Sequence, residues 1–111
     1  MPDDCVFCRI VNGELPANLV LREEGIIAFL DIHPAASTHA LVVPERHIDD
    51  LRQMDDADLW LRLTRAAHKV AEELGHADGY RFYVSVGQGG GQTVPHLHVH
   101  VLAGEMRRLP A

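Results

Sequence analysis

Three histidines alternate with aliphatic residues near the end of this chain, in the segment Pro95-His96-Leu97-His98-Val99-His100-Val101-Leu102. Residues two apart in a β-strand share one face and lie about 6–7 Å from each other along it. The alternation predicts a strand over about 94–103, with three imidazoles on one face and Leu97, Val99 and Val101 on the other. Imidazole acts as a nucleophile, an acid or base, or a metal ligand near neutral pH. Because core packing explains three aligned histidines poorly, they predict a chemical site.

Composition limits the kinds of protein that this chain can be. Its 111 residues fit one domain over 1–111. The formal charge is −6 and no run of Lys or Arg is present, so the basic footprint of a nucleic-acid-binding protein is missing. No apolar stretch approaches the ~20 residues of a transmembrane helix, and residues 1–20 lack the pattern of a signal peptide. We expect a cytoplasmic protein that binds neither nucleic acid nor membrane.

Hydrophobic periodicity along the chain predicts an α+β fold. Apolar residues recur at helical spacing from Asp55 to Leu74, with acidic residues in the first turn and Gly75 after the last apolar position. Strands on both sides of one long helix indicate a mainly antiparallel sheet. The predicted elements are a short helical turn over 6–12, strands over 19–21, 26–30, 39–43, 80–86 and 94–103, and a loop over 31–38.

Two interpretations of the histidine strand are open from the residues alone. His96, His98 and His100 could bind one metal ion, as in zinc sites with three histidines. Alternatively, one imidazole is a nucleophile that its neighbours orient and polarise. The glycine-rich segment 87–93 favours the second interpretation, because glycines let backbone N–H groups converge on an anion such as phosphate.

Residues 91–102 resemble the signature of the histidine triad (HIT) family of nucleotide hydrolases and transferases, His-φ-His-φ-His-φ-φ with φ apolar. The resemblance covers nearly the whole chain, and the Hint-type purine nucleoside phosphoramidases are the most similar branch. It implies a HIT-like fold, with a five-stranded antiparallel sheet and one long and one short helix. It also implies a homodimer with a continuous ten-stranded sheet. The further matching segments are 5–10, 15–17, 28–32 and 38–44.

The resemblance implies a hydrolase that acts on purine nucleoside 5′-phosphoramidates of the AMP-lysine or AMP-NH2 type. In such enzymes the middle histidine, here His98, attacks the α-phosphate and forms a covalent nucleotidyl-histidine, from which water releases the nucleoside monophosphate. Thr93 corresponds to a hydroxyl residue that assists the leaving group. The implied catalytic residues are His98, His100, His96, His39 and Thr93.

The resemblance also implies how a purine nucleotide, an AMP or GMP derivative, is bound. Asp31 corresponds to an acidic residue that accepts both ribose hydroxyls, which suits the two oxygens of a carboxylate. Ser85 stands where an Asn is common near the phosphate, and Leu109 stands where Hint proteins often carry a Trp. The other implied contacts are Val6, Phe7, Ile10, Phe29 and Ile32 around the base, and Gly91, Gln92 and Val94 around the phosphate.

Two alternatives to the phosphoramidase function remain within this family resemblance. The segment 91–94 also resembles the dinucleoside polyphosphate hydrolase branch, although 103–105 lacks the basic pair often seen there. A nucleotide-binding regulatory module without turnover is the other alternative.

The two cysteines are spaced as half of a tetrahedral metal site, Cys5-x2-Cys8. From spacing alone, a redox pair, a metal half-site or two incidental thiols are all possible. Resemblance to some bacterial HIT proteins and to related uridylyltransferases implies that His47 and His96 complete the site. We therefore expect a structural zinc ion held by these four residues, and no metal in the catalytic step.

Overall fold

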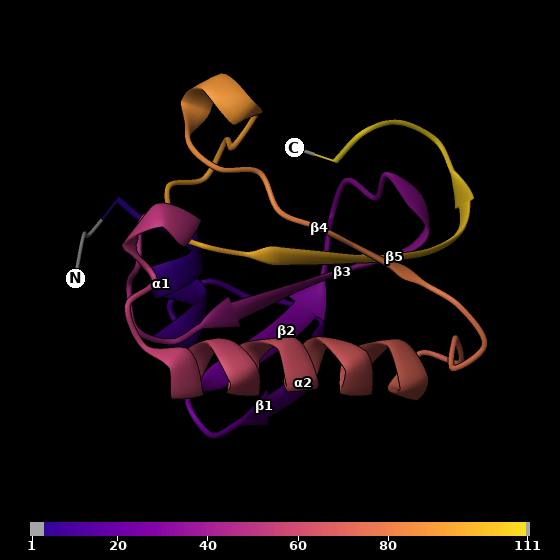
Figure 1. Ribbon diagram of the computed structural model, residues 1–111, viewed down its shortest axis with the longest axis horizontal. Helices are drawn as coiled ribbons and strands as arrows, with labels where there is room; N and C mark the ends of the chain where they lie inside the picture. Colours follow the sequence, from indigo (N-terminus) through magenta and orange to yellow (C-terminus); the bar gives the residue numbers. More distant parts are fainter. Residues whose placement is uncertain (1–3, 111) are drawn as a thin grey trace.

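The computed structural model describes residues 4–110 and shows one sheet with a helix on each face (Figure 1). The sheet is antiparallel and five-stranded, in the order β1-β2-β3-β5-β4. This arrangement confirms the predicted α+β fold with one long and one short helix. The elements are α1 (Val6–Val11), β1 (Leu19–Glu23), β2 (Ile26–Leu30), β3 (Ala36–Pro44), α2 (Ala57–Glu73), β4 (Arg81–Tyr83) and β5 (Val99–Met106).

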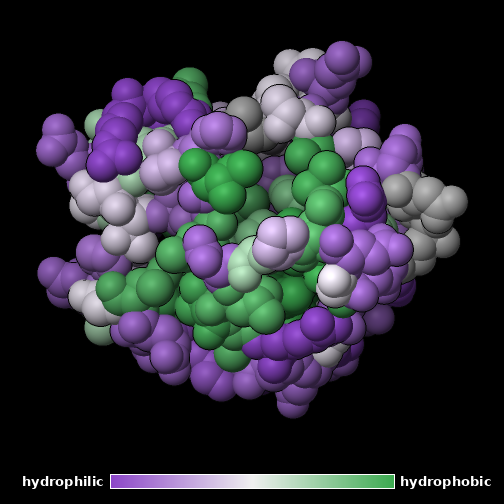
Figure 2. All heavy atoms as spheres, turned by 180° about the vertical axis from the view of Figure 1, so that it is seen from behind, coloured by the Kyte–Doolittle hydropathy of each residue, from purple (hydrophilic) through white to green (hydrophobic). Residues whose placement is uncertain are grey.

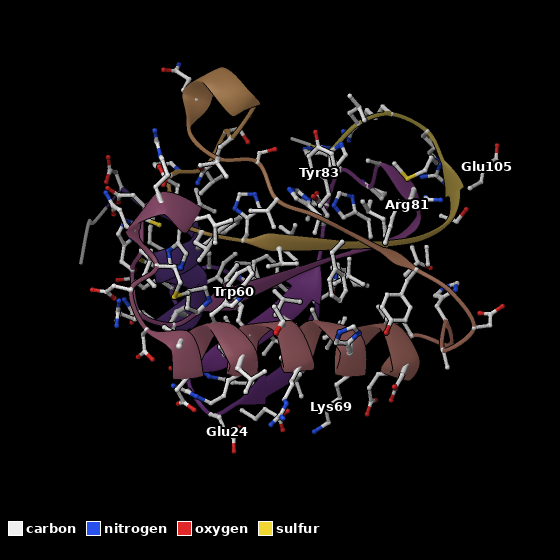
Figure 3. All side chains as sticks on the ribbon, in the orientation of Figure 1. Glu24, Trp60, Lys69, Arg81, Tyr83 and Glu105 are labelled. Atoms are coloured by element: carbon white, nitrogen blue, oxygen red, sulfur yellow. The ribbon has the colours of Figure 1, made fainter. Side chains whose placement is uncertain are left out.

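The long helix α2 has the boundaries that its sequence signals indicate. The Asp56 carboxylate accepts a hydrogen bond from the Leu59 N–H at 3.0 Å, which caps the first turn. The helix is followed by Gly75, whose φ of +89° suits a residue without a side chain. In Figure 3, Trp60 lies between α2 and the sheet. Lys69 reaches the edge strand β1, where its ammonium lies 3.0 Å from the Glu23 carboxylate. Among residues 4–110, no helix has the length and hydrophobicity needed to cross a bilayer.

The two faces of the sheet form two separate apolar cores, because side chains alternate along each strand. One core lies under α2 and includes Ala28, Val42 and Val99. The other lies under α1, where Phe7 packs against β2 and β3. The predicted alternation of residues 96–101 between the two faces is confirmed. Its aliphatic members Leu97, Val99 and Val101 all belong to the α2 core.

Several predicted strand boundaries are wrong. The last strand begins at Val99 rather than near 94, because β3 ends at Pro44 and the chain then turns away. The residues before Val99 bond to this turning segment instead, as in the bond from the Leu97 N–H to the Ile48 carbonyl at 2.6 Å. The strand predicted over 39–43 already begins at Ala36, and the strand predicted over 80–86 covers only 81–83.

The α2 core is expected to carry much of the stability. Leu63 is fully buried in this core, so Leu63→Ala should lower the free energy of unfolding by about 3 kcal/mol. Leu61 lies on the same helix but is 46% exposed, so Leu61→Ala should change it by less than about 0.5 kcal/mol. Urea unfolding of both variants measures the difference, and equal losses would contradict this account of the core.

Candidate functional site

A cavity of about 400 Å³ lies on the α1 side of the sheet. Figure 2 looks onto this side from behind and shows hydrophobic side chains gathered around the middle of the face, with hydrophilic ones around them. The apolar residues predicted to surround a base all line this cavity, as do Asp31, Thr93 and Val94. The wall of the cavity therefore combines an apolar surface with a few polar groups. Its predicted apolar members are Val6, Phe7, Ile10, Phe29 and Ile32.

His98 lines the cavity from the segment just before β5. Its Nδ1 lies 2.7 Å from the carbonyl oxygen of His96. A carbonyl can only accept, so Nδ1 carries the proton and Nε2 of the neutral ring keeps a free electron pair. Burial lowers the pKa of His98, which favours this neutral form. The ring of Phe7 meets it edge-on at 5.1 Å between centroids and fixes its orientation.

His100 lies next to His98, at 4.8 Å between ring centroids, and is the end of a hydrogen-bonded chain. The Ala35 N–H donates to Nδ1 of His39 at 2.8 Å, so the Nε2–H of His39 donates to Nδ1 of His100 at 2.8 Å. The Nε2–H of His100 is buried and has no hydrogen-bond partner among residues 4–110. Because burying a polar group without a partner is unfavourable, this donor indicates a place for an acceptor from outside the chain.

Asp31 and Tyr83 border this chain of imidazoles. The Asp31 carboxylate accepts from the His33 N–H at 2.8 Å, and its other oxygen lies 3.4 Å from Nε2 of His39. Tyr83, labelled in Figure 3, reaches His100 from β4 with 6.0 Å between ring centroids. Burial, together with neighbouring imidazole charge, lowers the pKa of His100 to about 3. His100 is therefore neutral at physiological pH.

A second group of side chains brings together Cys5, Cys8, His47 and His96, whose ligand atoms all lie within 4.8 Å of one another. Both cysteines are free thiols. The sulfur of Cys8 lies 3.2 Å from Nδ1 of His47 and 3.5 Å from Nδ1 of His96. The sulfur of Cys5 lies 3.4 Å from the same His96 nitrogen. Two thiols and two imidazoles that converge in this way could bind a metal ion.

The protonation of the two imidazoles fits a metal-ligand role. The Nε2–H of His96 donates to the Pro44 carbonyl at 2.8 Å, and the Nε2–H of His47 donates to the Asp49 carboxylate at 2.7 Å. Both rings therefore present an unprotonated Nδ1 to the sulfurs, and the outer partners fix their orientation as in metal sites. Burial lowers the pKa of His96 to about 4, and burial beside Cys5 raises the pKa of the Cys8 thiol to about 11.

The three triad histidines do not converge on one point. His96 turns to the cysteines, whereas Nδ1 of His98 and Nδ1 of His100 are occupied by hydrogen bonds. Among the described residues, the possible metal-binding groups do not include the set His96, His98 and His100. Of the two interpretations of the histidine strand, the structure thus favours a nucleophile supported by its neighbours.

The glycine-rich segment folds into a tight turn next to the cavity, where Gly87 and Gly91 adopt φ values of +72° and +93°. The side chain of Gln92 holds this turn together. Its Oε1 accepts from the Gly87 N–H at 2.8 Å, and its Nε2 donates to the carbonyls of Asp49 and Val94. Among the predicted nucleotide contacts, Ser85, Gly91 and Gln92 do not line the cavity.

The cavity also has lining residues that the sequence did not indicate as functional. His33 and Arg108 are polar members of its wall, and Leu15, Pro16, Ala17, Leu30 and Leu41 extend its apolar part. Arg108 is the most informative of these. It comes from the segment after β5, and nothing in the sequence pattern places that segment beside a cavity formed by α1 and β2.

Taken together, the fold and the site define an α+β protein with a neutral histidine pair at an apolar cavity. The HIT domain model matches residues 12–107, and the chain belongs to the HIT family. An uncharacterised HIT-like protein of Methanocaldococcus jannaschii is 39% identical over 100 residues, which cover 88% of this chain and 77% of the relative. Protein HitA of Neisseria gonorrhoeae is 35% identical over 102 residues, or 90% of this chain and 95% of the relative.

Solved structures show the same architecture. A HIT family hydrolase from Legionella pneumophila is 40% identical, with a TM-score of 0.88 and coverage of 96% of this chain and 98% of that one. A histidine triad protein from Clostridium difficile is 39% identical, with the same TM-score and coverage of 100% and 97%. These similarities extend the family relationship from the histidine motif to the whole fold.

The lowered pKa of His100 predicts a loss of stability in acid. Between its ordinary pKa of 6.5 and its value of about 3 here, the unfolded chain binds a proton that the folded chain excludes. The protonation of His100 therefore does not reduce the free energy of unfolding above pH 6.5. Below that pH this group lowers it by at most about 1.4 kcal/mol per pH unit. Urea unfolding between pH 7 and pH 4 should give a shallower slope for His100→Asn than for the wild type. Parallel slopes would contradict the assignment.

Proposed function

We propose that this chain is a nucleotide hydrolase of the Hint-type branch, which cleaves purine nucleoside 5′-phosphoramidates through a covalent nucleotidyl-histidine on His98. The observation that carries this proposal is the pair of ring nitrogens at the cavity. His98 has a free electron pair on Nε2, and His100 beside it has an unpartnered N–H. A nucleophile next to a donor suits attack on a phosphorus atom whose oxygens gain negative charge. The hydrolase named among the similar structures supports the same reaction class.

The proposed reaction has two displacements. In the first, Nε2 of His98 forms a bond to the α-phosphorus, and the bond from phosphorus to the leaving nitrogen breaks. The amine leaves with a proton that the Thr93 hydroxyl relays from solvent. In the second, water forms a bond to phosphorus and loses a proton to solvent, and the bond from phosphorus to Nε2 of His98 breaks. This step releases the nucleoside monophosphate and neutral His98. The His100 N–H donates to a phosphate oxygen in both steps.

The remaining predicted residues have binding and positioning roles in this proposal. The base packs against the apolar wall that α1 and Phe29 form, and Asp31 binds the ribose hydroxyls. His39 acts through His100, since the hydrogen bond between them fixes which His100 nitrogen carries the proton. The turn held by Gln92 presents the backbone N–H groups of Thr93 and Val94 to the phosphate.

We further propose that Cys5, Cys8, His47 and His96 hold one structural zinc ion, which takes no part in the reaction. The donor set and the unprotonated Nδ1 atoms of both histidines support zinc, which prefers four such ligands in a tetrahedron. A cytoplasmic location and a homodimer with a joined ten-stranded sheet remain parts of this proposal that rest on the family resemblance.

Replacing the proposed nucleophile tests the reaction. His98→Ala should lower the hydrolysis of adenosine 5′-phosphoramidate by about 10³-fold or more, because the variant lacks the imidazole nitrogen that would form the bond to phosphorus. Intact-protein mass spectrometry of briefly reacted wild type should show an added adenylyl group that the variant lacks. His68→Ala, at an exposed position on α2, is the matched control and should behave as wild type. Turnover in His98→Ala at the wild-type rate would refute the proposal.

The substrate class needs a separate comparison, because a dinucleoside polyphosphate hydrolase would form the same adduct. The phosphoramidase proposal predicts a higher kcat/KM for adenosine 5′-phosphoramidate than for diadenosine polyphosphates. The reverse order would support the polyphosphate alternative. Binding of AMP without hydrolysis of either substrate would support a regulatory module.

Metal analysis tests the zinc site. Protein purified without a histidine tag should contain about one zinc ion per chain, as a site with four protein ligands requires. Cys8→Ser should reduce this content well below one, because it removes a ligand that contacts both histidines. His68→Gln should leave it unchanged. A wild-type content far below one after growth with added zinc would defeat this part of the proposal.

A further inference from the structure

Among the residues that the structure describes, two carry the fixed charges of the cavity wall, Asp31 and Arg108. Its other polar lining groups are hydroxyl, imidazole or backbone groups, and two of the imidazoles at the site are neutral for a structural reason. Nδ1 of His39 accepts from the Ala35 N–H, and Nδ1 of His100 accepts from His39. A ring nitrogen that accepts a hydrogen bond carries no proton, so neither ring is a cation. Arg108 therefore supplies the permanent positive charge of the cavity wall.

Arg108 is held at the cavity by contacts from its backbone and from its side chain. After β5 the chain curves back toward the loop between β2 and β3 (Figure 1). The N–H groups of Arg107 and Arg108 approach the Ala35 carbonyl at 2.7 and 3.3 Å, and the Arg108 guanidinium donates to the His33 carbonyl. The Asp31 carboxylate accepts from the His33 N–H in the same loop. Arg108 is thus hydrogen-bonded to the loop that also carries Asp31, the residue proposed to bind the ribose.

The electrostatic effect of Arg108 reaches the histidines. Burial is the main reason that the pKa of His39 is lowered, Asp31 opposes this effect, and the positive charge of Arg108 lowers the pKa further. Among residues 4–110, the His33 carbonyl is the only hydrogen-bond partner of this guanidinium, which has five N–H donors. Guanidinium groups with free donors bind phosphate with favourable geometry.

A dianionic ligand needs such a charge in this chain. The formal charge of the protein is −6, and Asp31 adds a negative charge to the cavity wall itself. We propose that Arg108 is the anion-selecting residue of the cavity, whose guanidinium binds the phosphate group of an entering nucleotide and makes the site prefer nucleotides to nucleosides. This inference rests on the proposed nucleotide site and adds the residue that recognises the charge of the ligand.

The test compares binding of AMP and adenosine, which differ only in the phosphate. Calorimetry should give a Kd for AMP that is about tenfold or more weaker in Arg108→Ala than in wild type. The Kd for adenosine should change by less than about twofold. Arg107→Ala is the matched control, because this neighbouring arginine is exposed and does not line the cavity. It should leave both dissociation constants unchanged, and Arg108→Lys should restore part of the AMP affinity.

Salt dependence provides a second measurement. Raising the ionic strength from about 0.05 M to about 0.5 M should weaken AMP binding more in wild type than in Arg108→Ala, because the screened charge is absent from the variant.

The outcomes separate the two proposals. If wild type binds neither AMP nor adenosine, the proposed nucleotide site fails and this inference fails with it. If wild type prefers AMP and Arg108→Ala keeps that preference, only the role of Arg108 is overturned. Equal weakening of AMP and adenosine in Arg108→Ala would also overturn it, because the residue would then act by positioning the chain. Equal losses of AMP affinity in Arg107→Ala and Arg108→Ala would overturn it as well, because the net charge of the protein would then explain the effect.

Discussion

The hydrogen bond from Nδ1 of His98 to the carbonyl of His96 is the interaction on which the site depends. It fixes which nitrogen of His98 carries the proton, and so leaves an electron pair on the other nitrogen, as the proposed attack requires. The acceptor is a backbone group of a residue whose own side chain belongs to the cysteine–histidine group. His96 itself is fixed by its bond to Pro44, where β3 ends. The protonation of His98 is therefore set by a backbone group whose residue is itself held by the end of β3.

Burial of the imidazoles keeps the rings neutral but lowers the stability of the folded chain. A buried ring with a pKa of about 3 stays neutral over the physiological range, so the N–H of His100 is a constant donor. Leaving that donor without a partner costs about 1–3 kcal/mol in a folded protein. The two apolar cores on either side of the sheet can offset such a penalty, and a phosphate oxygen that accepts the bond would remove it. Sites of binding and catalysis commonly carry local destabilisation of this kind.

The sequence predicted periodic features well and long-range contacts poorly. Alternation at 96–101 indicated the two faces correctly, and the acidic first turn and Gly75 indicated the limits of α2 closely. The start of β5 could not be predicted, because it depends on where β3 turns away at Pro44. The protonation of His100 depends on Ala35 and His39, which are distant in sequence, so no local pattern contains it. The place of Arg108 at the cavity has the same origin.

The short helix α1 explains why the cysteine–histidine group and the cavity lie so close together. Cys5 caps this six-residue helix and Cys8 lies one turn later, so its two thiols face His96. Phe7, between them in sequence, instead meets the ring of His98 and lines the cavity. A helix of this length is unstable by itself in water, so its place is set by what it contacts on each side. Because this one helix borders both, the cysteine–histidine group and the cavity wall both depend on the correct placement of α1.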